Sequence, residues 1–267
     1  MKALFGQESQ TRNFLGTLAS GKMPHAWLLT GSKGIGKASF ADLAAHKILD
    51  GVATGDMSLD SFHVSPDSQT AHLIAAGSHP DFLRLERLPK DSKSASSGPT
   101  NADLKRNISV DQVRSLQSMF LTKPSFSKYR VIIIDSIDDL ESSGANALLK
   151  NLEEPPADTV FLLVSHAPDR LLPTIRSRCR ALRFDSLSNE HVVEALKQNH
   201  PNMDEQEIQA LTEAGEGSPG RALALAGLDL AELQGLMEQL VSAGDPTNSL
   251  KNILIKKLSL KASQARY

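Results

Sequence analysis

Cysteine and aromatic residues are scarce in this sequence. Cys179 is the one cysteine among 267 residues, and Phe, Trp and Tyr together make up 4% of the chain. A single cysteine can form neither an internal disulfide nor a zinc site, which needs about four ligands. No apolar run reaches the roughly 18 residues that a membrane span requires, and residues 1–8 lack the apolar core of a signal peptide. We therefore expect a cytoplasmic protein without a membrane anchor.

The chain also lacks a large excess of positive or negative charge. The formal net charge is −2, so composition gives no basic footprint for nucleic acid. His63, His72 and His79 lie between residues 50 and 80 without any cysteine, and we expect no metal site there, because isolated histidines are usually solvated or core residues. Hydrophobic residues make up 40% of the chain, which predicts a globular protein of one or two domains with a real core.

The first 185 residues alternate apolar strands with amphipathic helices, the pattern of a parallel sheet covered by helices. Expected strands lie at 26–30, 81–85, 131–134, 160–164 and 180–184. A capping-box pattern at Ser109 and Gln112 predicts the start of a helix, and Pro155-Pro156 ends another. After Asp185 the pattern is purely helical.

A phosphate-loop pattern, Gly31-Ser-Lys-Gly-Ile-Gly-Lys-Ala38, follows the first strand. Gly31, Gly34 and Gly36 let several backbone N–H groups point into one concavity at a helix N-terminus, which suits an anion. Lys37 would lie against the β- and γ-phosphates. The next position normally supplies a magnesium-binding hydroxyl, but it is Ala38 here, and Ser39 lies about 100° further around the helix.

Two further motifs lie downstream: Gly144-Ala-Asn-Ala-Leu-Leu-Lys-Asn-Leu-Glu-Glu-Pro-Pro156 and Ser177-Arg-Cys179. Together with the phosphate loop and the strand Val131-Ile-Ile-Ile-Asp135, they resemble bacterial sliding-clamp loader subunits, and most closely the delta-prime family of the DNA polymerase III holoenzyme. The resemblance covers roughly residues 1–227. It implies an AAA+ α/β P-loop domain at 1–185, a helical lid at 186–227 and a partial helical collar, reduced or truncated, at 228–267.

The resemblance also implies that the catalytic site is defective. Asp135 can still orient metal-bound water, but the glutamate that follows it in active relatives is Ser136 here. A hydroxyl is a poor proton acceptor near neutral pH, so general-base assistance is lost. No cofactor is then required, and we expect no ATPase activity of the chain alone. Two interpretations of the glycine loop remain open: a structural turn without a ligand, or weak binding of ATP or ADP without hydrolysis.

Three more residues take roles by their match to the family. Arg178, in Ser-Arg-Cys, corresponds to the arginine finger that crosses a subunit interface to a neighbour's ATP, a task suited to a planar and permanently charged guanidinium. Ser165 matches the first sensor position, and Arg221 matches the second sensor arginine. For Arg176 and Arg180 we expect ordinary surface ion pairs, and Cys179 is expected to be a small buried residue.

The resemblance implies a stator, meaning a stationary subunit that supplies Arg178 in trans while the complex loads the sliding clamp on primed DNA. Its partners would be the tau- or gamma-type ATPase subunits, the delta subunit, the clamp and, through the complex, DNA. The chain would then be a component of a DNA-directed DNA polymerase, a nucleotidyltransferase. An active AAA+ motor subunit and a P-loop small-molecule kinase are the alternatives. Ala38 and Ser136 count against the motor subunit, and the kinase would need a substrate lid and a magnesium ligand, neither of which we find in the sequence.

Overall fold

The computed structural model describes residues 4–54, 62, 65–90, 104–226, 228, 230–245 and 247–262. It divides into two compact units. The first is built from the chain up to residue 87 together with 106–186, and the second from 88–105 together with the chain from 187 on. None of the helices in these described ranges is long and apolar enough to cross a bilayer.

The first unit contains one five-stranded parallel sheet, in the order β2-β3-β4-β1-β5. Its strands are β1 (Ala26–Thr30), β2 (Phe82–Glu86), β3 (Arg130–Asp135), β4 (Thr159–Ser165) and β5 (Arg180–Arg183). The five strands expected from the sequence are thus confirmed to within a residue or two. The central strands β3 and β4 are buried along nearly their whole length, as their unbroken aliphatic sequences predict.

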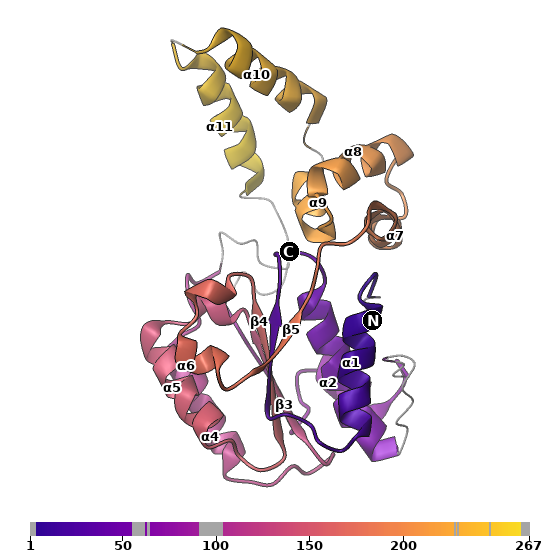
Figure 1. The fold of residues 1–267 in the computed structure, drawn as a ribbon, viewed down its shortest axis with the longest axis vertical. Coiled ribbons are helices and arrows are strands. Elements are labelled where there is room, and N and C mark those ends of the chain that lie inside the picture. The colour runs from indigo at the N-terminus through magenta and orange to yellow at the C-terminus, as the bar shows by residue number, and fades with distance from the viewer. Residues whose placement is uncertain are drawn as a thin grey trace. The chain divides into compact units, whose positions relative to one another are not determined.

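Helices cover both faces of this sheet (Figure 1). On one face, α1 (Glu8–Ala19) and α2 (Lys37–Thr54) pack through residues such as Phe14 and Phe40, and α3 (Gln69–Ala75) lies against α2. On the other face, α4 (Val110–Phe120), α5 (Ser142–Glu153) and the short α6 (Pro173–Arg176) contribute Leu116, Leu148 and Ile175. Single 3₁₀ turns, η2 (Ile137–Asp139) and η3 (Pro168–Arg170), follow β3 and β4. This architecture is the α/β fold, with a helix-covered parallel sheet, that the sequence predicts.

Local sequence signals account for the helix boundaries. The capping box at Ser109 and Gln112 is present at the start of α4, with the Ser109 hydroxyl accepting from the Gln112 N–H and the Gln112 side chain accepting from the Ser109 N–H. α5 ends at Glu153, just before Pro155 and Pro156. The predictions at these two positions are therefore confirmed.

The second unit is helical, as predicted for the chain after Asp185. It contains α7 (Asn189–Asn199), α8 (Glu205–Gly215), α9 (Pro219–Leu225), α10 (Leu230–Ala243) and α11 (Ser249–Ala262). The hydroxyls of Ser188 and Ser218 and the carboxylate of Asp204 cap the first three of these helices. The lid and the collar expected at 186–227 and 228–267 fall within this one unit, so the finer division stays a prediction.

Candidate functional site

The phosphate loop joins β1 to α2 in a backbone conformation that only glycine adopts easily. Gly31, Gly34 and Gly36 have φ values of 144°, 82° and 102°. A Cβ atom on Gly31 would lie 2.4 Å from the carbonyl oxygen of Phe184, which directly follows β5. The loop is therefore held close to the sheet edge, with the first turn of α2 beginning at Lys37. Its shape fits the anion cradle predicted from the three glycines.

Lys37 is folded back onto this loop. Its Nζ atom donates to the carbonyl oxygens of Gly31, at 2.6 Å, and Ser32, at 2.5 Å, and the residue is almost fully buried. Burial lowers the pKa of Lys37 to about 8, against the opposing effect of the Asp138 and Asp135 carboxylates. The lysine therefore carries its charge at neutral pH, and a bound phosphate would have to replace the two carbonyl groups as its partners.

Asp135 ends β3 at the same edge of the sheet, and its carboxylate is engaged by an arginine. Nη2 of Arg84, on β2, lies 2.5 Å from Oδ2 of Asp135. The sequence analysis did not single out Arg84; the signal available was a charged residue between two leucines at the centre of β2. The carboxylate expected to orient metal-bound water thus has an internal cation as its partner.

Asp138, in the turn after β3, organises the rest of this edge. Its carboxylate accepts hydrogen bonds from the hydroxyls of Ser136, at 3.0 Å, and Ser165, at 2.9 Å. It also accepts from the backbone N–H groups of His166 and Ala167. Ser136 and Ser165 are both buried. The side chains at the catalytic-glutamate and first-sensor positions are therefore both bonded to the Asp138 carboxylate.

His166 follows Ser165 and adds a neutral group beside the lysine. Burial, and to a lesser degree the Lys37 charge, lower the pKa of His166 to about 4. Its buried Nδ1 atom has no hydrogen-bond partner among the described residues. The imidazole is therefore uncharged at physiological pH.

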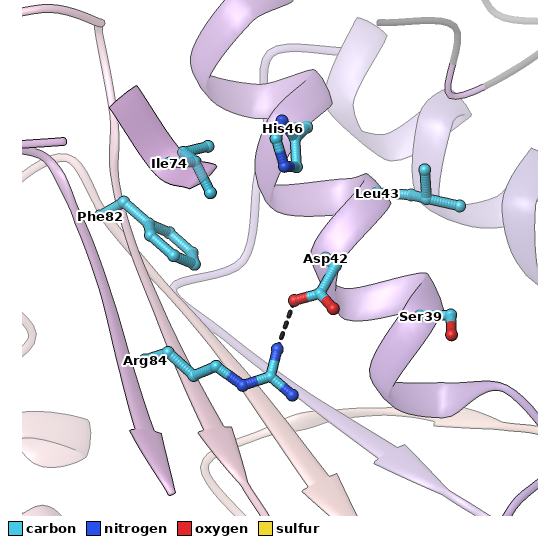
Figure 2. Close-up of a pocket in the computed structure, with 7 residues that line it drawn as sticks. All are labelled: Ser39, Asp42, Leu43, His46, Ile74, Phe82 and Arg84. Carbon is cyan, nitrogen blue, oxygen red and sulfur yellow. Dashed lines mark hydrogen bonds and ion pairs between the residues drawn. The ribbon is translucent and has the colours of Figure 1, made fainter. Parts of the chain in front are cut away.

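A pocket of about 350 Å³ opens beside this edge, between α2, α3 and β2 (Figure 2). Along α2 it is lined by residues spaced three and four apart, Ser39, Asp42, Leu43 and His46, and on the opposite side by Ile74, Phe82 and Arg84. Figure 2 shows the Arg84 guanidinium directed at Asp42. Ser39 thus shares a helix face with Asp42 and belongs to the pocket wall.

Arg178 lies at the surface of the first unit, between α6 and β5. Its Nη2 atom is 2.9 Å from Oε1 of Glu153, and its Nη1 atom donates to the carbonyl oxygen of Thr174 at 2.9 Å. About a third of its side-chain surface is exposed. Arg178 precedes β5, at the edge of the parallel sheet where the strands begin, whereas Lys37 follows β1 and Asp135 ends β3 at the opposite edge. A glutamate of the Leu-Glu-Glu-Pro-Pro motif holds the arginine in place.

The neighbours of Arg178 have other partners. Arg176 makes a long ion pair with Asp169, at 3.7 Å, as expected. The guanidinium of Arg180 instead lies 4.8 Å from the ring centre of Trp27 and donates to Asn13. Among the described residues, Arg180 thus makes a cation–π contact in place of the ion pair that we expected. Burial raises the pKa of the Cys179 thiol to about 12, which leaves no nucleophilic thiolate near neutral pH.

The remaining residues considered in the sequence are Arg221 and the histidines between residues 50 and 80. Arg221 belongs to the second unit, at the start of α9, where its Nη1 atom is 2.5 Å from Oε2 of Glu216. His63 lies outside the described residues. Among the residues that are described, no group of three or more His, Cys, Asp or Glu side chains is arranged to hold a metal ion.

Known proteins with similar sequences are replication proteins. DNA polymerase III subunit delta′ of Pseudomonas aeruginosa is 34% identical over 217 residues, which cover 80% of this chain and 58% of that protein. The gamma subunit of Buchnera aphidicola subsp. Schizaphis graminum is 27% identical over 84% of this chain and 56% of its own length. The tau subunit of Bacillus subtilis is 28% identical over 82% of this chain and 36% of its own length. The chain thus spans little more than half the length of the first two and about a third of the last.

A family model described as DNA polymerase III, delta subunit, matches residues 6–188, which include the phosphate loop, Asp135 and Arg178. This match covers well over half of the chain. The resemblance inferred from the sequence motifs is therefore confirmed: the chain belongs to this family, and it is similar to proteins named DNA polymerase III subunit delta′.

Proposed function

We propose that this chain is a stator of the DNA polymerase III clamp loader, which works in the cytoplasm without hydrolysing ATP itself. It supplies Arg178 to ATP bound by an adjacent tau- or gamma-type subunit. Through that complex, which includes the delta subunit, it takes part in placing the sliding clamp on primed DNA.

One observation carries the first half of this proposal. The position after Asp135 holds Ser136, whose hydroxyl donates to Asp138 at 3.0 Å in a buried environment. A serine cannot accept the proton of an attacking water near neutral pH, and this one is already committed as a donor. With Ala38 also lacking a magnesium-binding hydroxyl, hydrolysis loses two of its ordinary requirements.

Arg178 supports the second half. Its guanidinium is permanently charged and has five N–H donors in a fixed fork, and its contacts with Glu153 and Thr174 engage only part of them. A partly exposed arginine held at the protein surface suits phosphate oxygens presented by another subunit. The family match over residues 6–188 includes this position.

The test is a reconstituted clamp loader that carries Arg178→Ala. An arginine finger contributes about 10³- to 10⁵-fold to the rate at its own site, so clamp- and DNA-stimulated ATP turnover should fall, by less if the loader's other ATP sites keep their fingers. Arg176→Ala is the matched control, because Arg176 is a surface arginine two residues away whose ion pair among the described residues is a long one to Asp169. A correctly assembled complex with unchanged turnover in the Arg178 variant would refute the assignment.

The competing function is that of an active motor subunit, favoured by the similarity to proteins named gamma and tau. It requires ATP turnover by this chain at its own phosphate loop. The same similarity disfavours a small-molecule kinase. Turnover by the chain alone separates the stator from the motor subunit.

A further inference from the structure

The Arg84 guanidinium lies at the edge of the sheet where Asp135 ends β3. In the parallel pairing of β2 with β3, Arg84 is opposite Ile133 and Glu86 is opposite Asp135. Since side chains alternate between the two faces of a sheet, these four residues share one face. Ile133 belongs to the hydrophobic cluster that includes α2, so this face is the one that α2 covers.

Three carboxylates surround the Arg84 guanidinium. Nη2 lies 2.5 Å from Asp135 and Nε lies 2.9 Å from Glu86, while Nη1 bonds to Asp42 on α2. Only 24% of the Arg84 side chain is exposed. Burial lowers the pKa of Arg84, but the carboxylates of Asp42, Asp135 and Glu86 together raise the pKa by more than burial lowers it, so the net shift is upward. The guanidinium is a fixed positive charge that links β2, β3 and α2.

Magnesium does not fit the residues at this edge. A nucleotide-bound Mg²⁺ needs near-octahedral oxygen ligands, usually including the hydroxyl after the P-loop lysine and water oriented by the acid that ends the neighbouring strand. Ala38 provides no hydroxyl. The Asp135 carboxylate already holds a guanidinium at hydrogen-bonding distance, and a divalent cation beside it would have to displace or repel that charge.

The phosphate cradle itself is nevertheless intact. Gly31, Gly34 and Gly36 keep the left-handed conformations that direct backbone N–H groups inward, and Lys37 stands at the start of α2. We propose that Arg84 is the resident cation of this site, in place of Mg²⁺, and that the phosphate loop binds the diphosphate group of ADP or ATP without a metal ion. The inference concerns the chain's own loop and does not depend on the role of Arg178.

The experiment measures ATP and ADP dissociation constants of the intact chain by calorimetry, in excess EDTA and in excess MgCl₂. For the unmodified chain, we expect the two conditions to agree within about twofold, well under the tenfold that corresponds to about 1.4 kcal/mol. Arg84→Lys keeps a cation near Asp135 and should keep this metal independence. The double variant Ala38→Thr with Arg84→Met restores the hydroxyl and releases Asp135, so magnesium should raise its ATP affinity at least about tenfold.

The matched control is Ala38→Thr with Arg87→Met. Arg87 lies three residues after Arg84, is equally buried, and pairs with Asp139 at 3.3 Å. This control leaves Arg84 on Asp135 and should stay metal-independent. Thermal melts of all variants would identify any that fail to fold, in which case Arg84→Lys and the unmodified chain still decide the question. Metal-dependent binding by the unmodified chain, or no detectable nucleotide binding in either buffer, would overturn the proposal.

Discussion

Arg178 and Glu153 form an ion pair in which Nη2 of the arginine lies 2.9 Å from Oε1 of the glutamate. Glu153 is the last residue of α5 and belongs to the Leu-Glu-Glu-Pro-Pro motif, whereas Arg178 belongs to Ser-Arg-Cys. The two family motifs therefore meet in space through one pair of side chains. Because both side chains are partly exposed, the pair adds at most about 1 kcal/mol to stability. Its main effect is to orient the arginine.

Glu153→Gln tests this orienting effect. The free energy of unfolding should change by less than about 1 kcal/mol, as is usual for an exposed pair. In a reconstituted loader, however, ATP turnover should fall several-fold, since Arg178 loses its charged partner and samples more orientations. Glu154→Gln, one residue further along, is the control and should leave turnover unchanged. Equal effects of the two variants would show that Glu153 does not position Arg178.

Gly31→Ala should destabilise the first unit. The alanine would occupy a φ of 144°, and its Cβ would lie 2.4 Å from the Phe184 carbonyl oxygen. We expect the free energy of unfolding to fall by at least about 2 kcal/mol in urea titrations. Gly16→Ala, within α1 and with open space around its Cβ, should instead stabilise the chain by about 0.5–1 kcal/mol. A Gly31→Ala chain as stable as the unmodified one would contradict the geometry of the loop.

The buried histidines predict that stability decreases in mild acid. Burial lowers the pKa of His166 to about 4, and it also lowers the pKa values of His46 and His79. Between that value and the ordinary histidine pKa of 6.5, the unfolded chain is protonated at His166 while the folded chain is not. The unfolded state then binds more protons, so the free energy of unfolding decreases as the pH falls, by up to about 1.4 kcal/mol per pH unit for each such group.

Urea titrations at about pH 7 and about pH 5 measure this effect, with the fluorescence of the single tryptophan, Trp27, reporting on the first unit. His166→Asn should lose less stability over this interval than the unmodified chain, whatever its stability at neutral pH. The same pH dependence in both chains would show that His166 titrates normally.

The strand positions and the phosphate loop could be predicted because their signals are local. The aliphatic run from Val131 to Ile134, the glycines of the loop and the caps at Ser109 and Ser218 each fix a structure through neighbouring residues. In the parallel sheet, the carboxyl ends of β1, β3 and β4 lie at one edge, which brings Asp135 and Ser165 to the edge where the phosphate loop leaves β1.

The side-chain bonds of Arg84 and Asp138 at this edge could not be predicted in this way. The contact between Arg84, Asp42 and Asp135 joins three elements, and more than forty residues separate each acid from the arginine. No local pattern indicates with which acid a single arginine in a strand will pair. Asp138 is similar, because its bond to Ser165 depends on how the turns after β3 and β4 face each other. Periodicity places a residue on a face of an element, whereas these pairings depend on packing between elements.

The most direct test of the proposed stator function is magnesium-dependent ATP turnover by the purified chain, compared with a Lys37→Ala control prepared in the same way. We expect both proteins to release phosphate at the same background rate, because Ser136 and Ala38 provide neither a general base nor a metal ligand. Turnover that is clearly above background in the unmodified chain and absent from the Lys37→Ala variant would contradict this account and would identify the chain as a motor subunit.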